Sequence, residues 1–184
     1  MALGPTEQKF ILHWGEMGTR WGVNRTVAQI HALLYITGRP MHADEICETL
    51  AVARSNASTS LRELQNWNLV RLLHLSTDRR DHYETSTHVW ELMRTIARER
   101  QRREIAPTME VLRELLDSAA IGDEPAAVTR RMRETLELLE TLTAWGEEML
   151  RLDTETLMKV LKLGAKIKKL LGDGGSRPKS RGAA

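Results

Sequence analysis

The stretch that decides the fold runs from Ala43 to Tyr83 and reads ADEICETLAVARSNASTSLRELQNWNLVRLLHLSTDRRDHY. Its pattern predicts a helix, a tight turn, a second helix with a polar outer face, and then a short hairpin. Elements in this order are typical of a winged helix-turn-helix, a unit that places its second helix in the major groove of DNA. We therefore expect residues 24–87 to form a winged helix-turn-helix DNA-binding domain, in a mainly α chain with a small β wing.

The second helix of this stretch has an apolar inner stripe and a polar outer face. Ala57, Ser60, Leu61 and Leu64 recur at helical spacing and should be buried together. The outer face carries small hydrogen-bonding side chains and arginine, whereas an ordinary solvated helix would more usually carry Glu and Lys. Such a face suits contacts with base edges and phosphates. The candidate DNA-binding residues on this helix are Arg54, Ser55, Asn56, Ser58, Thr59 and Arg62.

The wing is expected to follow as two strands, 69–75 and 81–85, joined by a turn over residues 76–80. Arg79 and Arg80 then lie at the tip of the hairpin, where they could enter a narrow minor groove or bind its phosphates. The alternative is an ordinary solvated turn, since charged hairpin tips are common on protein surfaces. The position directly after the polar helix favours DNA binding.

Helices are also expected before this domain. Apolar residues at spacings of three and four predict a helix over 6–21, which ends near Gly22. A second helix is expected from Asn24, as its cap, to Tyr35, followed by a loop over 38–42. A lone helix of the length predicted over 6–21 is only marginally stable in water. We therefore expect the N-terminal helix of residues 1–23 to form part of a dimer interface.

Beyond the wing the chain is expected to be helical from His88 to Leu171, with Pro107 either interrupting a helix or starting a new one. A long apolar seam runs over 128–152, more than a small winged helix could cover. We therefore expect residues 88–171 to form a C-terminal helical region that dimerises and has room for an effector. A homodimer would place two recognition helices about one DNA turn (~34 Å) apart on a near-palindrome. Residues 172–184 form a basic tail that is expected to be disordered.

The run from Trp21 to Leu116 resembles the MarR superfamily of regulators, and more closely its GbsR-like branch. The likeness is carried by GVNRTVAQIHALLYITGRPMHADEICETL, by ARSNASTSLRELQNWNLV, by the wing STDRRDHYE, and by HVWELMRTIARERQRREIAPTMEVL. The resemblance implies a dimeric repressor or activator whose outer helices dimerise and whose DNA affinity is often set by a small ligand. By position, the residues that match the family's recognition helix and wing are Arg54, Asn56, Ser58, Asp78, Arg79 and Arg80.

The chain departs from the family pattern at Asn68, where glycine is usual. A helix should end at this position in a left-handed residue, and asparagine is the next best choice after glycine. The departure is therefore compatible with the same turn.

Five tryptophans accompany a single phenylalanine. Trp14, Trp21 and Trp90 are candidates for an aromatic cage around a quaternary ammonium ligand, because ring faces attract cations. Some relatives of the GbsR-like branch respond to choline-type osmolytes, which gives this hypothesis a ligand class. The alternative is that each tryptophan lies in a seam between helices, since large aromatic side chains are first of all core and interface residues.

Other chemistry finds little support in the sequence. Cys47 is the one cysteine, and its apolar neighbours indicate an inert thiol. The six histidines lack metal-ligand spacing, and neither a phosphate-binding glycine loop nor a nucleophile with its base is evident. We therefore expect no enzyme activity, no metal and no cofactor. The lysine-rich helix over 159–169 could meet an anionic membrane or DNA, but its wide apolar side favours packing against a partner.

Charge and hydropathy set the remaining expectations. Residues 24–87 hold seven Lys+Arg and seven Asp+Glu, so net charge alone does not indicate DNA binding. The chain lacks a secretory leader and a run of about 20 apolar residues, which predicts a cytoplasmic protein, nucleoid-associated when bound to DNA and without membrane contact. The rival hypothesis is a protein-interaction adaptor that uses the winged helix only as a scaffold.

Overall fold

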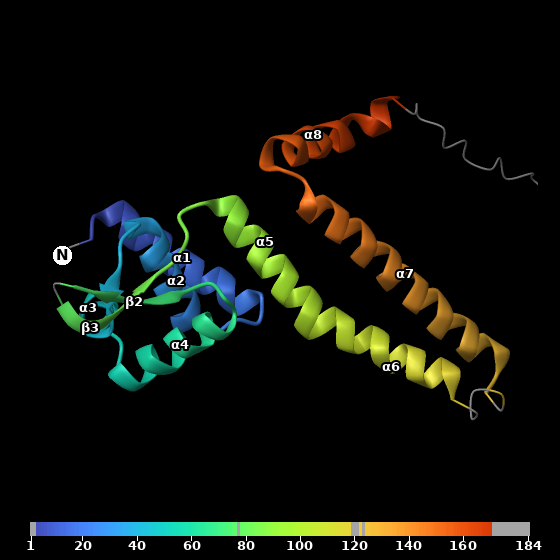
Figure 1. Cartoon of the computed structure of the whole chain (residues 1–184), viewed down its shortest axis with the longest axis horizontal. Helices are drawn as coiled ribbons and strands as arrows, with labels where there is room; N and C mark the ends of the chain where they lie inside the picture. The colour runs from blue at the N-terminus through green and yellow to red at the C-terminus, as the bar shows by residue number, and fades with distance from the viewer. Residues whose placement is uncertain (1–2, 77, 119–121, 123, 171–184) are drawn as a thin grey trace, which may run out of the picture. The chain divides into compact units, whose positions relative to one another are not determined.

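The computed structural model of the chain describes residues 3–76, 78–118, 122 and 124–170 (Figure 1). Internal contacts divide it into an N-terminal unit, Met1–Pro107, and a C-terminal unit, Thr108–Ala184. In chain order the elements are α1 (Pro5–Arg20), α2 (Arg25–Thr37), β1 (Met41–His42), α3 (Ala43–Leu50), α4 (Arg54–Asn66), β2 (Arg71–Leu75), β3 (Asp78–Glu84), α5 (Val89–Arg100), the π-helix η1 (Gln101–Ile105), α6 (Ala106–Asp117), α7 (Ala126–Arg151) and α8 (Thr154–Leu170).

The bounds of the first two helices agree with the prediction to within two residues. The side-chain oxygen of Asn24 accepts a hydrogen bond from the backbone N–H of Thr26 at 2.8 Å and so caps α2. Gly38, with φ of 61°, ends α2 two residues later than predicted. Helix α1 lies very close to α2, since a Cβ atom on Gly18 would lie only 2.5 Å from the Cβ atom of Ala28. This helix is therefore an integral part of the N-terminal unit.

The helix-turn-helix of α3 and α4 follows the prediction closely. Ala51, with φ of 52°, turns the chain between the two helices, and Asn68, with φ of 54°, turns it after α4. The left-handed turn at Asn68 was expected, and the one at Ala51 was not. The inner stripe of α4 is buried and joins a core in which the largest fully buried side chains are Ile30, Leu33, Leu34, Met41, Ile46, Leu61 and Leu64.

The sheet has three antiparallel strands in the order β1-β3-β2. Met41 pairs with Tyr83 and His42 with His82, so the expected loop over 38–42 in fact ends in a two-residue strand. This short strand pairs with the edge of β3 and satisfies backbone groups that would otherwise be left open. Two residues carry too little pattern to be recognised as a strand in the sequence.

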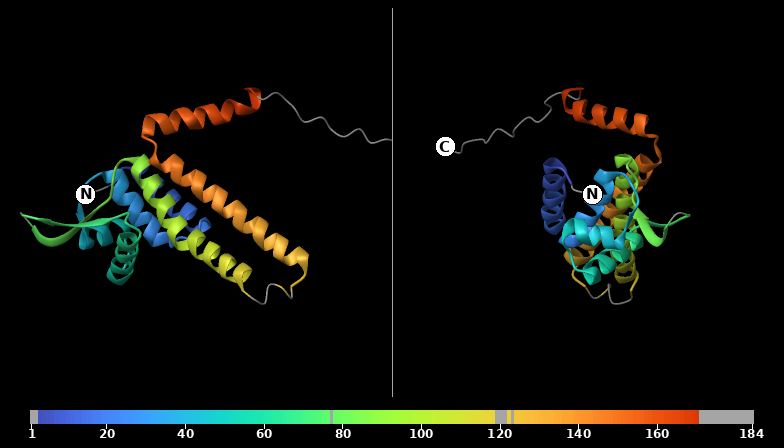
Figure 2. Two further views of the ribbon diagram at one scale, coloured as in Figure 1. Left: turned by 45° about the vertical axis from the view of Figure 1, so that its right-hand side comes forward. Right: turned by 90° about the vertical axis from the view of Figure 1, so that its left-hand side faces the viewer.

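The wing differs from the prediction in where its second strand begins. Leu75 pairs with Asp78, so β3 starts at Asp78 rather than at Asp81. The Asp78 carboxylate accepts a hydrogen bond from the backbone N–H of Arg80 at 3.0 Å, within the first residues of the strand. Arg79 and Arg80 therefore lie in the first residues of β3 and not in the turn itself. Figure 2 shows this hairpin projecting from the helices of the N-terminal unit.

Helix α5 continues without a break through η1 into α6, and Pro107 is the second residue of α6. Proline has no N–H with which to bond the carbonyl of Arg103, and the helix is locally widened to a π-helix over η1 just before it. Neither of the two expected alternatives is found in full, since Pro107 lies near the start of α6 but the helix is continuous there.

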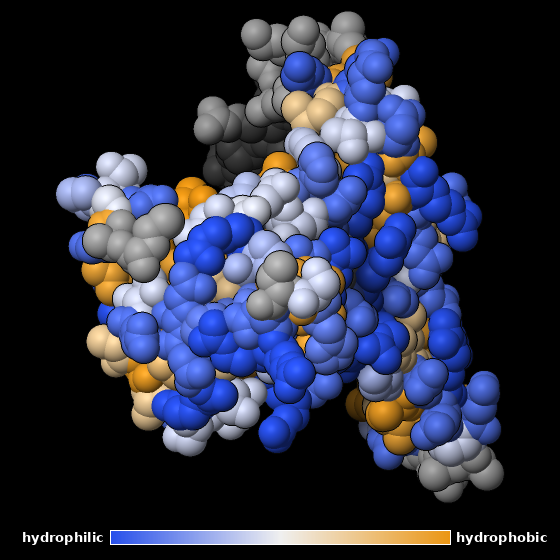
Figure 3. Space-filling view, turned by 60° about the vertical axis from the view of Figure 1, so that its left-hand side comes forward, coloured by the Kyte–Doolittle hydropathy of each residue, from blue (hydrophilic) through white to orange (hydrophobic). Residues whose placement is uncertain are grey.

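The C-terminal unit consists of long helices whose apolar seam remains open. Arg113 of α6 forms an ion pair with Glu140 of α7 at 2.7 Å. No side chain of α7 is buried, and Leu142 and Trp145 of the expected seam are 55% and 58% exposed. Figure 3 shows apolar residues in separate patches among a mostly hydrophilic surface. The expected tail over 172–184 lies outside the described residues, and none of the described helices is long and apolar enough to cross a membrane.

Candidate nucleic-acid interface

The outer face of α4 brings the predicted recognition residues together. Arg54, Ser55, Asn56, Ser58, Thr59 and Arg62 are all exposed, and they alternate at helical spacing with the buried inner stripe. The Ala53 cap has no side-chain hydrogen bond, so the N–H groups of the first turn of α4 remain open to a phosphate. The face can therefore offer hydrogen-bond donors and acceptors to base edges and donors to the backbone of a duplex.

Arg54 is held at the start of α4 by an ion pair with Asp44 of α3. The sequence analysis missed Asp44, because its partner lies ten positions away on another helix and no local spacing marks the pair. The ion pair is solvent-exposed, with 62% of the Arg54 side chain and 53% of the Asp44 side chain accessible, so it directs Arg54 more than it stabilises the fold.

Arg80 of the wing is fixed by Asp78. Its Nε atom lies 3.0 Å from both carboxylate oxygens of Asp78, and its Nη2 atom lies 2.5 Å from Oδ2. Hydrogen bonds from the Arg80 side chain and then from its backbone N–H hold the pKa of Asp78 well below its usual range. The backbone carbonyl of Arg80 accepts a bond from Nδ1 of the buried His82 at 2.8 Å. These contacts hold both the side chain and the backbone of Arg80 in place on β3.

The arginines of residues 24–87 divide into paired and unpaired ones. Four form ion pairs with acids of the same domain: Arg39 with Glu45, Arg54 with Asp44, Arg71 with Glu84, and Arg80 with Asp78. Among the described residues, the guanidinium groups of Arg25, Arg62 and Arg79 form no ion pair or hydrogen bond. Two of these three lie on the outer face of α4 and on the wing. The unpaired positive charge thus sits at the positions from which DNA contacts are expected.

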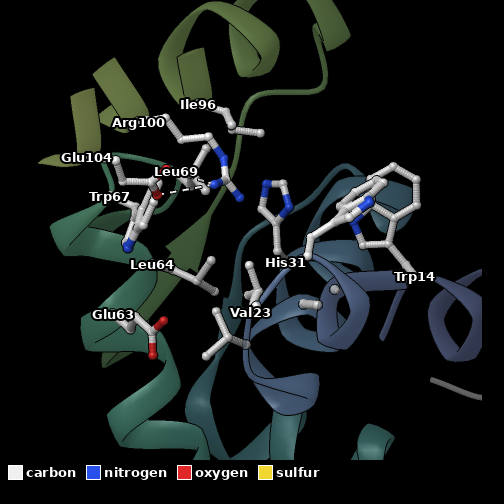
Figure 4. A pocket seen from close by; sticks show the side chains of 15 residues that line it. Trp14, Val23, His31, Glu63, Leu64, Trp67, Leu69, Ile96, Arg100 and Glu104 are labelled. Carbon is white, nitrogen blue, oxygen red and sulfur yellow. Dashed lines mark hydrogen bonds and ion pairs between the residues drawn. The ribbon is translucent and has the colours of Figure 1, made fainter. Parts of the chain in front are cut away.

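Two of the three candidate cage tryptophans lie together, and the third does not join them. The Trp14 and Trp21 rings are 6.2 Å apart and packed edge to face. They line a cavity of about 530 Å³, whose wall includes Trp67 but not Trp90. A second cavity of about 620 Å³ shares four of its lining residues with the first: Trp14, His31, Ile96 and Arg100. Figure 4 shows Trp14 and Trp67 on opposite sides of the first cavity, with His31 and Arg100 between them.

His31 is the buried polar group of both cavity walls. Its Nε2 atom lies 3.2 Å from Oγ1 of Thr85, whose hydroxyl donates to the carbonyl oxygen of Leu69 at 2.7 Å. Since that hydroxyl proton is used, Nε2–H of His31 is the donor to Thr85. Burial lowers the pKa of His31 to about 4, so the ring is neutral at physiological pH. Arg100, paired with Glu104 at 3.1 Å, is then the cationic side chain of the shared wall.

The Cys47 thiol and the metal-ligating side-chain types were the other candidates for reactive chemistry. Burial raises the pKa of the half-buried Cys47 thiol, and the neighbouring Glu48 carboxylate adds to the effect. No group of three or more His, Cys, Asp or Glu side chains in the described part of the chain could hold a metal ion.

Comparisons with known proteins concern the fold of the chain and the sequence of its winged-helix segment. A crystal structure described as that of a transcriptional regulator matches with a TM-score of 0.68 and 22% identity, over 79% of this chain and 96% of that one, and so shares the fold. A comparison with curated proteins finds no match. The family model described as MarR family matches residues 21–81, which contain α2, α3, α4 and most of the wing. The winged-helix segment of this chain is thus similar in sequence to the MarR family, within the fold of a transcriptional regulator.

Proposed function

We propose that this chain is a sequence-specific, DNA-binding transcription regulator of the MarR family, nearer to its GbsR-like branch. The observation that supports this most directly is the exposed polar face of α4. It carries Arg62, which has no ion pair among the described residues, and the wing with Arg79 and Arg80 follows it in sequence. The α4 helix would contact base edges in the major groove, and the wing arginines would contact the minor groove or its phosphates. We expect no catalytic activity and no cofactor.

The regulator would act as a homodimer on a near-palindromic site. Apolar side chains stay exposed on α1, α6 and α7, among them Leu12, Val111, Leu138 and Trp145. Exposed apolar surface of this extent along flanking helices is typical of an interface between subunits. A two-fold axis between such helices would set two α4 helices about one DNA turn, ~34 Å, apart. A protein of this kind works in the cytoplasm, on the nucleoid when bound to DNA.

A gel-shift experiment tests DNA binding. The full-length protein is expected to retard a fragment that flanks its own coding region at lower concentration than an unrelated fragment of equal length, and the affinity should fall steeply as salt rises. If no flanking fragment is retarded preferentially and selection from a random-sequence pool enriches no motif, the protein is an adaptor in which the winged helix is only a scaffold. An adaptor has no use for a polar α4 face followed by a wing with two arginines.

The cavities beside α2 would hold a small effector that alters DNA affinity. Quaternary ammonium compounds are the first class to test, because Trp14 and Trp21 form an aromatic corner of the first cavity and Trp67 lines it as well. Choline or betaine is expected to change the tryptophan fluorescence of the full-length protein in a saturable way. Trp14→Phe should remove most of this response, while Trp145→Phe, in the C-terminal unit, should retain it. A flat titration of the folded protein would exclude this ligand class.

A further inference from the structure

Glu99 of α5 is a buried carboxylate that the DNA-contacting face does not use. Only 8% of the residue is exposed, and it accepts three side-chain hydrogen bonds. The donors are Nη2 of Arg102 at 2.6 Å, Nε of Arg103 at 2.8 Å and Nδ2 of Asn68 at 2.8 Å. In this order they lower the pKa of Glu99 to about 2, so the group stays charged at every pH at which the protein would work.

The third donor, Asn68, connects Glu99 to the recognition helix. Asn68 lies 31 positions earlier in the chain, immediately after the C-terminal end of α4. Arg103 strengthens the connection, because it also donates to the backbone carbonyl of Asn66, at the last residue of α4. Its guanidinium lies over the ring of Trp67, 4.8 Å from the ring centroid. The end of α4 is therefore held against α5 and η1 by two hydrogen bonds and a cation–π contact.

The identity of Asn68 is explained by this contact and not by its backbone. With φ of 54°, the position would suit glycine better, because glycine has no Cβ atom to strain a left-handed conformation. Asparagine tolerates the conformation and adds a side-chain amide that reaches Glu99. Glycine at this position would remove the side-chain amide and relieve the backbone. Asn68→Gly therefore removes the contact with Glu99 and keeps the turn.

We propose that Glu99 is a positioning residue for DNA recognition: through Asn68 and Arg103 it fixes the angle between α4 and α5, and so the separation of the two recognition helices in the dimer. The inference rests on the proposed function, since it needs a dimer that binds DNA. Helices α4 and α5 lie in the same unit, so a change in the angle between them would move each recognition helix relative to α5, the helix that leads into the proposed dimerising region. Glu99 would then determine which spacing between the two half-sites of the operator the dimer binds most tightly.

The test measures affinity against operator spacing. An operator recovered from a random-sequence pool by the full-length protein is rebuilt with its half-sites moved one or two base pairs closer together or further apart. The measured quantity is the ratio of the affinity for the best spacing to the affinity for the altered spacings. Asn68→Gly and Glu99→Gln are each expected to reduce this ratio by about tenfold, which corresponds to the strength of a hydrogen bond to a charged group. Affinity for a single isolated half-site should stay within about twofold of the wild type, because the α4 face is intact. Arg98→Gln, which removes a charge from the exposed side of α5, should keep the wild-type preference.

The outcomes separate this inference from the proposed function. If the wild type enriches no operator, the proposed function fails and with it the basis for a spacing test. If the wild type prefers one spacing and Asn68→Gly keeps that preference, Glu99 has no positioning role. An equal loss of affinity at every spacing and at the single half-site would also overturn the proposal, since it would indicate general destabilisation. Should Glu99→Gln fail to fold, Asn68→Gly carries the test, because glycine adopts a positive φ readily.

Discussion

Replacing Arg62 with alanine is expected to weaken binding to the preferred operator by about 1–3 kcal/mol, which is about 5- to 150-fold, and to relax the base preference at one position of each half-site. Arg62 lies on the outer face of α4, and its guanidinium has no hydrogen bond or ion pair with the described residues. A guanidinium in that state can donate two parallel hydrogen bonds to O6 and N7 of a guanine without first breaking an internal contact. Arg62→Lys should recover the charge but little of the base preference.

The matched comparison for Arg62 is Arg79 of the wing, which also has no ion pair among the described residues. If Arg79 contacts phosphates, Arg79→Ala should weaken binding to all sequences alike and reduce the salt slope by about one. Titrations of both variants against the operator, a single-base variant of the operator and unrelated DNA, each at two salt concentrations, distinguish the two roles. Unchanged affinity of both variants at moderate salt would exclude this docking of the winged helix.

The parts of the interface that local pattern determines are predictable from the sequence. The inner stripe of α4 is buried as its spacing of three and four requires, and the bounds of α3 agree with the prediction. The left-handed turn at Asn68 is likewise a property of its residue type. These features depend on neighbours within one or two helical turns.

The parts that depend on long-range contacts are not predictable in this way. Asp44 meets Arg54 across a turn, and Glu99 meets Asn68 across 31 positions, so neither pair leaves a periodic signal. The left-handed turn at Ala51 is held by the packing of α3 against α4, since alanine has no preference for that conformation. Trp67 rather than Trp90 lines the cavity with Trp14 for the same reason, because helix packing and not sequence spacing decides which rings share a space.

The net charge of the domain illustrates the difference between composition and structure. Seven cations and seven anions over residues 24–87 predict no affinity for DNA. Four of the seven arginines form ion pairs with acids of the same domain: Arg39, Arg54, Arg71 and Arg80. The positive charge without an ion pair among the described residues therefore lies on few side chains. With so few unpaired charges per subunit, two linked subunits would be needed for tight binding, which makes affinity sensitive to dimerisation.

Acid is expected to destabilise the protein through His31. The pKa of His31 is about 4 in the folded chain, against 6.5 for an unburied histidine. Below pH 6.5 the unfolded chain therefore binds a proton that the folded chain excludes, and the free energy of unfolding falls until the pH reaches about 4. A difference of this size corresponds to about 3 kcal/mol, of which little is lost above pH 7. The Glu99 contribution lies lower, since its folded pKa of about 2 is depressed and its stabilisation is lost only as the pH falls below 4.5.

Urea unfolding of the wild type and of His31→Gln at several pH values between 7 and 4.5 tests this expectation. Glutamine can donate to Oγ1 of Thr85 as the imidazole does but cannot titrate, so the variant should lose much less stability over this range. His88→Gln, which replaces an exposed histidine, should follow the wild type. An identical pH slope for the wild type and His31→Gln would show that His31 is protonated without cost in the folded chain.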